Sequence, residues 1–118
     1  MNVAKDFEEF IALLNAHKVQ YLIVGGYALA IHGVPRYTGD IDVWIAKEEA
    51  NAENVLRAVN DFGFKILNLA REDFLRPNFI HQFGYPPLRI DILTDIEDVA
   101  FHDAWKRKIK GKLGKEVA

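Results

Sequence analysis

The stretch 21–45 constrains the fold more than any other part of the chain, because it joins two short apolar segments through a glycine pair and an aspartate pair. The first segment, Tyr21–Val24, is wholly apolar, which is typical of a strand inside a sheet. The second, 40–45, reads Asp-Ile-Asp-Val-Trp-Ile. Side chains alternate between the two faces of a strand. Asp40 and Asp42 are therefore predicted to share one face, and the apolar residues at 41, 43 and 45 the other.

Two neighbouring carboxylates repel each other and are costly to bury. A divalent cation between them removes this conflict, and oxygen ligands suit Mg²⁺ or Mn²⁺. A third aspartate, Asp91, lies in another apolar run, 88–93, on the same predicted face as Arg89. We therefore predict that Asp40, Asp42 and Asp91 form a metal site. The alternative is a pair of solvated carboxylates at a strand end, with Asp91 in an ion pair with Arg89.

The glycine pair, Gly25-Gly26, lies between the first strand and a short helical pattern over 27–32. Glycine allows a tight turn and a close approach of the backbone to a ligand. The N-terminus of the following helix favours an anion, because its N–H groups are free and its dipole is positive there. The pattern therefore predicts that a phosphate group binds at Gly25 and Gly26.

Three cationic or hydroxyl side chains lie near these motifs. Arg36 and Thr38 precede the aspartate pair and are candidates to contact a phosphate chain or an acceptor, although stabilising the turn is an equal alternative. Arg89 is a candidate to neutralise phosphate charge, and an electrostatic clamp on the carboxylates is its alternative.

Elsewhere the pattern predicts helices over 3–18, 47–62 and 98–108, strands over 64–67, 78–83 and 88–93, a helical turn over 71–75 and a left-handed cap at Gly63. This order predicts an α+β domain with a mixed sheet and helices mainly on one face. We expect 1–118 to be a single domain, C-terminally incomplete, in which 109–118 are poorly structured.

Composition excludes several classes of function. The chain has no cysteine, and therefore no disulfide framework, thiol nucleophile or cysteine-bound zinc. Its 15 basic and 17 acidic residues give a net charge of −2, which is no general argument for nucleic acid binding. A basic cluster over 105–115 would suit a polyanionic acceptor such as tRNA, or is simply solvated. No apolar run approaches a membrane span, and we expect a cytoplasmic protein without membrane contact.

The glycine pair after an apolar residue, the Asp40-Ile41-Asp42 motif and the later Ile90-Asp91-Ile92 motif together resemble the DNA polymerase β-like nucleotidyltransferase superfamily. The sequence is most similar to its small, single-domain prokaryotic branch, which includes partners in toxin–antitoxin and abortive-infection systems. The stretches that carry the resemblance are 21–45 and 88–108.

The resemblance implies a nucleotidyltransferase fold and the Mg²⁺-dependent transfer of a nucleoside monophosphate from an NTP to a hydroxyl, with release of pyrophosphate. Asp40 and Asp42 would bind both of two metal ions, and Asp91 the ion that activates the attacking hydroxyl. RNA such as tRNA, a protein or a small molecule would be the acceptor. A second subunit of a homodimer or a helical partner protein would complete the site. The alternative function is a non-catalytic nucleotide- or partner-binding member of the same fold, for example a toxin–antitoxin component.

Overall fold

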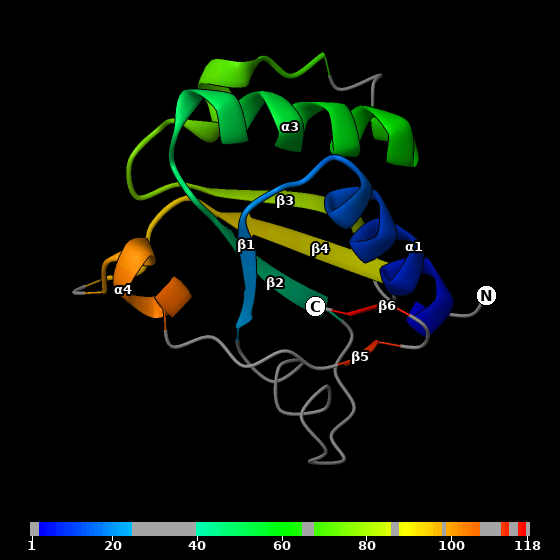
Figure 1. The fold of residues 1–118 in the computed structure, drawn as a ribbon. Helices are drawn as coiled ribbons and strands as arrows, with labels where there is room; N and C mark the ends of the chain where they lie inside the picture. The colour runs from blue at the N-terminus through cyan, green and yellow to red at the C-terminus, as the bar shows by residue number, and fades with distance from the viewer. Residues whose placement is uncertain are drawn as a thin grey trace.

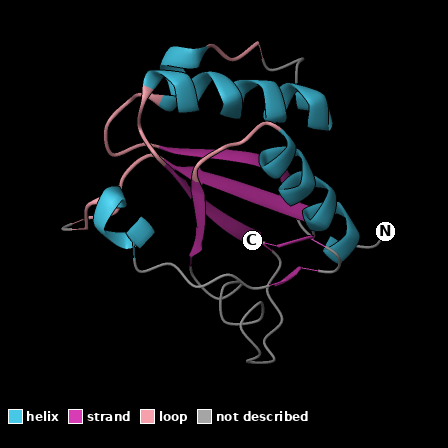
Figure 2. Cartoon of the chain, viewed as in Figure 1, coloured by secondary structure: helices cyan, strands magenta, loops and turns pink. Residues whose placement is uncertain are grey.

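The computed structural model describes residues 3–24, 40–64, 68–85, 88–97, 99–106, 112–113 and 116–117. Their helices and strands follow one another as α1 (Val3–Ala16), β1 (Tyr21–Val24), β2 (Asp40–Ile45), α3 (Glu49–Val59), a π-helical turn (Asn60–Phe64), a 3₁₀ turn (Arg71–Phe74), β3 (Ile80–Tyr85), β4 (Leu88–Leu93), α4 (Phe101–Lys106), β5 (Lys112–Leu113) and β6 (Glu116–Val117). Figure 1 shows α1 and α3 beside the central sheet and α4 apart from both, and Figure 2 distinguishes the same elements by type.

Four strands form one mixed sheet in the order β1-β2-β4-β3. β2 is antiparallel to β1 and parallel to β4, and β4 is antiparallel to β3 at the edge. β5 and β6 form a separate antiparallel pair that contacts α1. The architecture confirms the predicted α+β class with a mixed sheet.

The core lies between one face of this sheet and the helices α1 and α3. Alternate residues of β2 and β4 supply the sheet side, among them Ile41, Val43 and Ile92, which are fully buried. Both helices turn one apolar stripe toward this face, as their spacing predicts. The stripe residues are Phe7, Phe10, Ile11 and Leu14 of α1 and Ala52, Val55, Ala58 and Val59 of α3.

Several boundaries differ from those expected. α1 ends at Ala16 rather than at residue 18, and α4 begins at Phe101 rather than at residue 98. α3 ends at Val59 and widens into the π-helical turn, so the strand predicted over 64–67 is wrong at Phe64, and 65–67 lie outside the described residues. Gly63 has φ +114°, which confirms the left-handed position at the end of this helix. The strand predicted over 78–83 begins later, at Ile80, because Asn78 has φ +52° and cannot continue an extended strand.

Three further expectations have mixed outcomes. The strand predicted to end at 83 extends to Tyr85, and Gly84 within it pairs with Arg89 of β4. The helical turn near 71–75 is confirmed. The helix expected over 27–32 lies outside the described residues.

Candidate functional site

The register of the two parallel strands places Asp42 of β2 directly beside Asp91 of β4. Neighbouring strands lie roughly 4.8 Å apart, and side chains at paired positions share a face. The residues that flank each aspartate, such as Ile41 and Ile90, are fully buried on the core side. The two carboxylates therefore lie on the opposite face, which α1 and α3 do not cover.

Asp91 forms an ion pair with Arg89, two residues earlier on the same strand. The Arg89 Nε donates to Asp91 Oδ1 at 3.2 Å, and a second, weaker hydrogen bond joins the guanidinium to Oδ2 at 3.5 Å. The Asp91 side chain is only 10% exposed, whereas that of Arg89 is 37% exposed. The ion pair considered as the alternative for Asp91 is therefore formed, and the guanidinium neutralises a carboxylate that is nearly buried.

The donor set suits a hard divalent cation. Two carboxylates side by side supply oxygen ligands alone, and Arg89 forms an ion pair with one of them, Asp91. Within the described ranges, no group of three His, Cys, Asp or Glu side chains could hold a metal ion. The third predicted ligand, Asp40, pairs in register with Arg89, but its side chain lies outside the described residues. The triad therefore stays a prediction, of which the structure shows two members together.

Other predicted site residues fall outside the described ranges. These are Gly25, Gly26, Arg36 and Thr38. The described residue before the glycine pair is Val24, the last residue of β1 and the register partner of Asp42.

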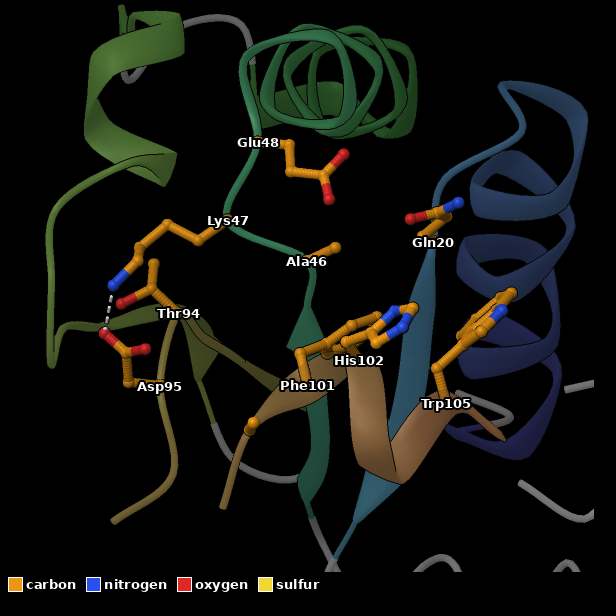
Figure 3. Close-up of a pocket in the computed structure, with 10 residues that line it drawn as sticks. Gln20, Ala46, Lys47, Glu48, Thr94, Asp95, Phe101, His102 and Trp105 are labelled. Atoms are coloured by element: carbon orange, nitrogen blue, oxygen red, sulfur yellow. Dashed lines mark hydrogen bonds and ion pairs between the residues drawn. The ribbon is translucent and has the colours of Figure 1, made fainter. Parts of the chain in front are cut away.

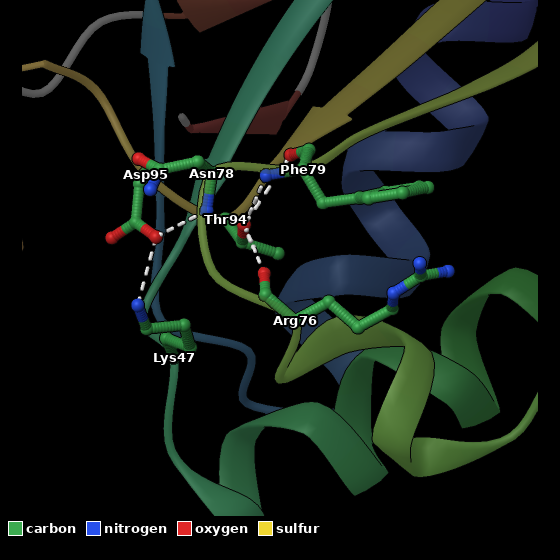
Figure 4. A network of polar contacts seen from close by, with 6 residues as sticks. All are labelled: Lys47, Arg76, Asn78, Phe79, Thr94 and Asp95. Atoms are coloured by element: carbon green, nitrogen blue, oxygen red, sulfur yellow. Dashed lines mark hydrogen bonds and ion pairs between the residues drawn. The ribbon is translucent and has the colours of Figure 1, made fainter.

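A polar network closes the other end of the parallel strands, just after β2 and β4 (Figure 4). Asp95 Oδ2 accepts hydrogen bonds of 2.7 Å from Lys47 Nζ and from the backbone N–H of Asn78. Thr94, which is 2% exposed, accepts from the Phe79 N–H and donates to the Arg76 carbonyl. Burial alone would raise the pKa of the Asp95 carboxyl, but the hydrogen bonds and positive charge of Lys47, with the Asn78 bond, lower it below its usual value.

The fold matches a solved structure. A crystal structure from Thermotoga maritima, named as a "putative nucleotidyltransferase", aligns with a TM-score of 0.50 and 17% sequence identity. The chain has a nucleotidyltransferase-like fold. The alignment covers 80% of this chain but 59% of the Thermotoga chain, so this chain spans about three fifths of its length. Comparisons with protein-family models and with curated proteins find no match.

The likeness confirms the expected nucleotidyltransferase-like fold. At this level of identity it establishes the fold of the nucleotidyltransferase-like sheet rather than its chemistry. Among the described residues, no helix is long and apolar enough to cross a membrane.

Sequence reasoning missed a pocket on this nucleotidyltransferase-like fold. The pocket has a volume of about 500 Å³ and lies where β2 and β4 end (Figure 3). Its lining residues are Gln20, Ala46, Lys47, Glu48, Thr94, Asp95, Ala100, Phe101, His102 and Trp105. The sequence predicts a helix over 98–108, but local spacing does not show that α4 lies beside the ends of two strands.

Aromatic contacts attach α4 to the sheet. The Phe101 ring meets Trp44 of β2 edge to face, with ring centroids 5.1 Å apart, and stacks on Trp105 at 5.8 Å. Trp44 is 3% exposed and occupies the same sheet face as Asp42. Its indole Nε1 is buried without a hydrogen-bond partner in the described part of the chain. α4 therefore covers part of the sheet face that also carries Asp42 and Asp91, at the end of β2 where Trp44 lies.

Proposed function

We propose that this chain is a metal-dependent nucleotidyltransferase. It transfers a nucleoside monophosphate from an NTP to a hydroxyl of an RNA, protein or small-molecule acceptor and releases pyrophosphate. The observation that carries the proposal is the adjacency of Asp42 and Asp91 on the face of a nucleotidyltransferase-like sheet that α1 and α3 do not cover. Such carboxylate pairs are what two-metal phosphoryl transfer requires.

Asp42 and Asp91, with Asp40, would hold Mg²⁺ or Mn²⁺. When bound, the metal would neutralise phosphate charge and lower the pKa of the attacking hydroxyl. The end of β1 supports this arrangement, because Val24 lies beside Asp42 and is followed in sequence by Gly25 and Gly26. We propose these glycines as the phosphate contact, with Arg36 and Thr38 as further nucleotide ligands.

Arg89 has two states in this proposal. Without metal it compensates the nearly buried Asp91, as its hydrogen bonds show. A bound cation would take over that compensation, and the guanidinium, already 37% exposed, would be released to bind a phosphate oxygen. Nucleotide and metal should therefore bind cooperatively. A metal bound to Asp91 frees Arg89 for the phosphate, and a phosphate bound to Arg89 frees Asp91 for the metal.

The test is calorimetric titration of the four NTPs, with and without Mg²⁺, into wild type and Asp42→Asn. We expect Mg²⁺-dependent binding that Asp42→Asn weakens by at least about tenfold, because one carboxylate of the pair is lost. Asp103→Asn on the exposed side of α4 makes the same charge change away from the carboxylates and is the control. Equal Mg²⁺-dependent affinity in wild type and Asp42→Asn would overturn the proposed metal site.

One observation favours a second function, a non-catalytic nucleotide- or partner-binding member of the fold such as a toxin–antitoxin component. The Arg89–Asp91 ion pair satisfies Asp91 without any metal. In that case NTP binding would not need Mg²⁺ and would weaken in Arg89→Ala but not in Asp42→Asn. The same titrations therefore separate the two functions.

A further inference from the structure

We propose that the pocket where β2 and β4 end binds a nucleobase, stacked against the aromatic wall of α4. This site is separate from the carboxylates. Ala46, one of its lining residues, follows Asp42 by four residues, which corresponds to roughly 13 Å along an extended strand. The inference rests on the pocket's own chemistry and does not require the metal site.

The position and size of the pocket are those of a ligand site. Ligands in open sheets bind outside the carboxyl ends of neighbouring parallel strands. β2 and β4 are such a pair, and the residues that directly follow them, Ala46 and Thr94, both line the pocket. A volume of about 500 Å³ falls within the usual range for small-molecule pockets.

One wall of the pocket is aromatic, and a buried side chain of the sheet packs against it. Trp44, buried in the sheet, supports Phe101 edge to face, and Phe101 in turn stacks on Trp105. Figure 3 shows Phe101, His102 and Trp105 along the same side of the pocket. A fixed aromatic surface of this kind favours a planar ring, because every nucleobase has a π face that can stack.

The opposite wall carries polar groups that match the edge of a base. Gln20 offers an amide donor and an acceptor together, and Glu48 offers a carboxylate. The Gln20 backbone is fixed by Asn51, which accepts from its N–H at 2.7 Å and donates to its carbonyl at 3.1 Å. The backbone that carries the Gln20 side chain is therefore held in place.

The charge of this wall argues for a base rather than a phosphate. Lys47 is the one lysine among the described lining residues, and its Nζ already forms an ion pair of 2.7 Å with Asp95 Oδ2. Glu48 adds a second carboxylate, so the described lining is rich in acceptors, and its one lysine is already paired. N–H groups on a ring edge are attracted to such a wall, whereas a phosphate is repelled.

Two molecules could supply the base. It could be part of the NTP whose phosphates reach Asp42 and Asp91, or part of a separate acceptor such as an unpaired RNA end. The recognition chemistry is the same in both cases.

The experiment uses intrinsic fluorescence, because the chain has two tryptophans. In Trp44→Phe, Trp105 is the remaining indole, and phenylalanine keeps an aromatic ring under Phe101. Adenosine, guanosine, cytidine and uridine are titrated without metal, followed by the four NTPs with Mg²⁺. We expect saturable quenching of Trp105 by at least one of these ligands.

Calorimetry on variants in which Trp44 is kept identifies the residues that form the wall. Trp105→Leu and Gln20→Ala should each weaken binding of the quenching ligand, the first by about tenfold or more. Phe79→Leu removes an aromatic ring outside the pocket and is the control. Melting curves confirm that each variant is folded.

Every outcome decides the proposal. Quenching by nucleosides alone supports a base from a separate acceptor, and quenching by NTPs with Mg²⁺ supports the base of the transferred nucleotide. Absence of saturable quenching by any of these ligands, or binding that Trp105→Leu and Gln20→Ala leave unchanged, would overturn it. Since the nucleoside titration needs no metal, its failure would leave the proposed metal site unaffected.

Discussion

Asn51 connects three elements through its side chain and gives the sharpest prediction of stability. It lies in the first turns of α3, is 5% exposed and makes three hydrogen bonds to backbone groups. Its Oδ1 accepts from the Gln20 N–H, and its Nδ2 donates to the carbonyls of Gln20 and Ala46. The residue therefore ties the start of β1 and the end of β2 to the helix.

The stability lost in Asn51→Ala depends on which hydrogen bonds the backbone partners of Asn51 retain. The Gln20 carbonyl retains the Ala46 N–H, and the Ala46 carbonyl retains the Glu48 N–H. The Gln20 N–H, which is only partly buried, keeps no described partner, and an orphan donor costs up to about 1–3 kcal/mol when buried. With about 1 kcal/mol for the two lost donor bonds, the free energy of unfolding should fall by about 2–4 kcal/mol. The melting temperature should fall by roughly 10 °C.

Asn51→Asp adds a pH signature. The carboxylate keeps the acceptor for Gln20 but faces two carbonyl oxygens, and burial and repulsion should raise its folded pKa above the unfolded value of about 3.9. The variant should then be most stable below that value and lose stability as the pH rises through the folded pKa.

Urea unfolding followed by circular dichroism measures both variants between pH 4 and 8. Asn54→Ala, on the same helix but partly exposed, is the matched control and should cost under about 1 kcal/mol. A loss below 1 kcal/mol in Asn51→Ala, or an Asn51→Asp profile parallel to that of wild type, would refute this reasoning.

Three other changes have distinct expected outcomes. Asp95→Asn should be less stable than wild type at pH 7. Because the Asp95 pKa is lowered by Lys47, this difference should vanish as the pH falls below the unfolded value of 3.8 and through the folded pKa, as melting curves will show. Arg89→Ala should lower the melting temperature without metal, and Mn²⁺ should restore it, because Asp91 loses its guanidinium partner. Gly63→Ala should cost about 1 kcal/mol or more in urea unfolding, from backbone strain at φ +114° rather than from a clash.

The local pattern was sufficient for the elements with clear periodicity. The strands 21–24 and 88–93 and the apolar stripes of α1 and α3 follow from alternation and helical spacing. Boundaries were less certain where one backbone angle decides them. Asn78 is followed by an aromatic residue and an isoleucine, which are typical of strands, yet its positive φ means that β3 begins only at Ile80.

The spatial relations could not be read from the pattern. Asp42 and Asp91 are far apart in sequence, and only the strand order makes them neighbours. The motif suggested the pair through its resemblance to a family, whereas nothing local pointed to the pocket. That pocket depends on where α4 lies against Trp44, which is a tertiary contact with no spacing rule.

The pairing of β2 with β4 also protects the site against error. A slip of one residue between these strands would turn Asp91 toward α1 and α3 and expose its flanking isoleucines, Ile90 and Ile92. The free energy of such a molecule would rise by the burial of a charge and the loss of two fully buried side chains. Misaligned chains would therefore be eliminated by their instability. The chain needs no separate device to align its carboxylates, because the hydrophobic residues between them set the alignment during folding.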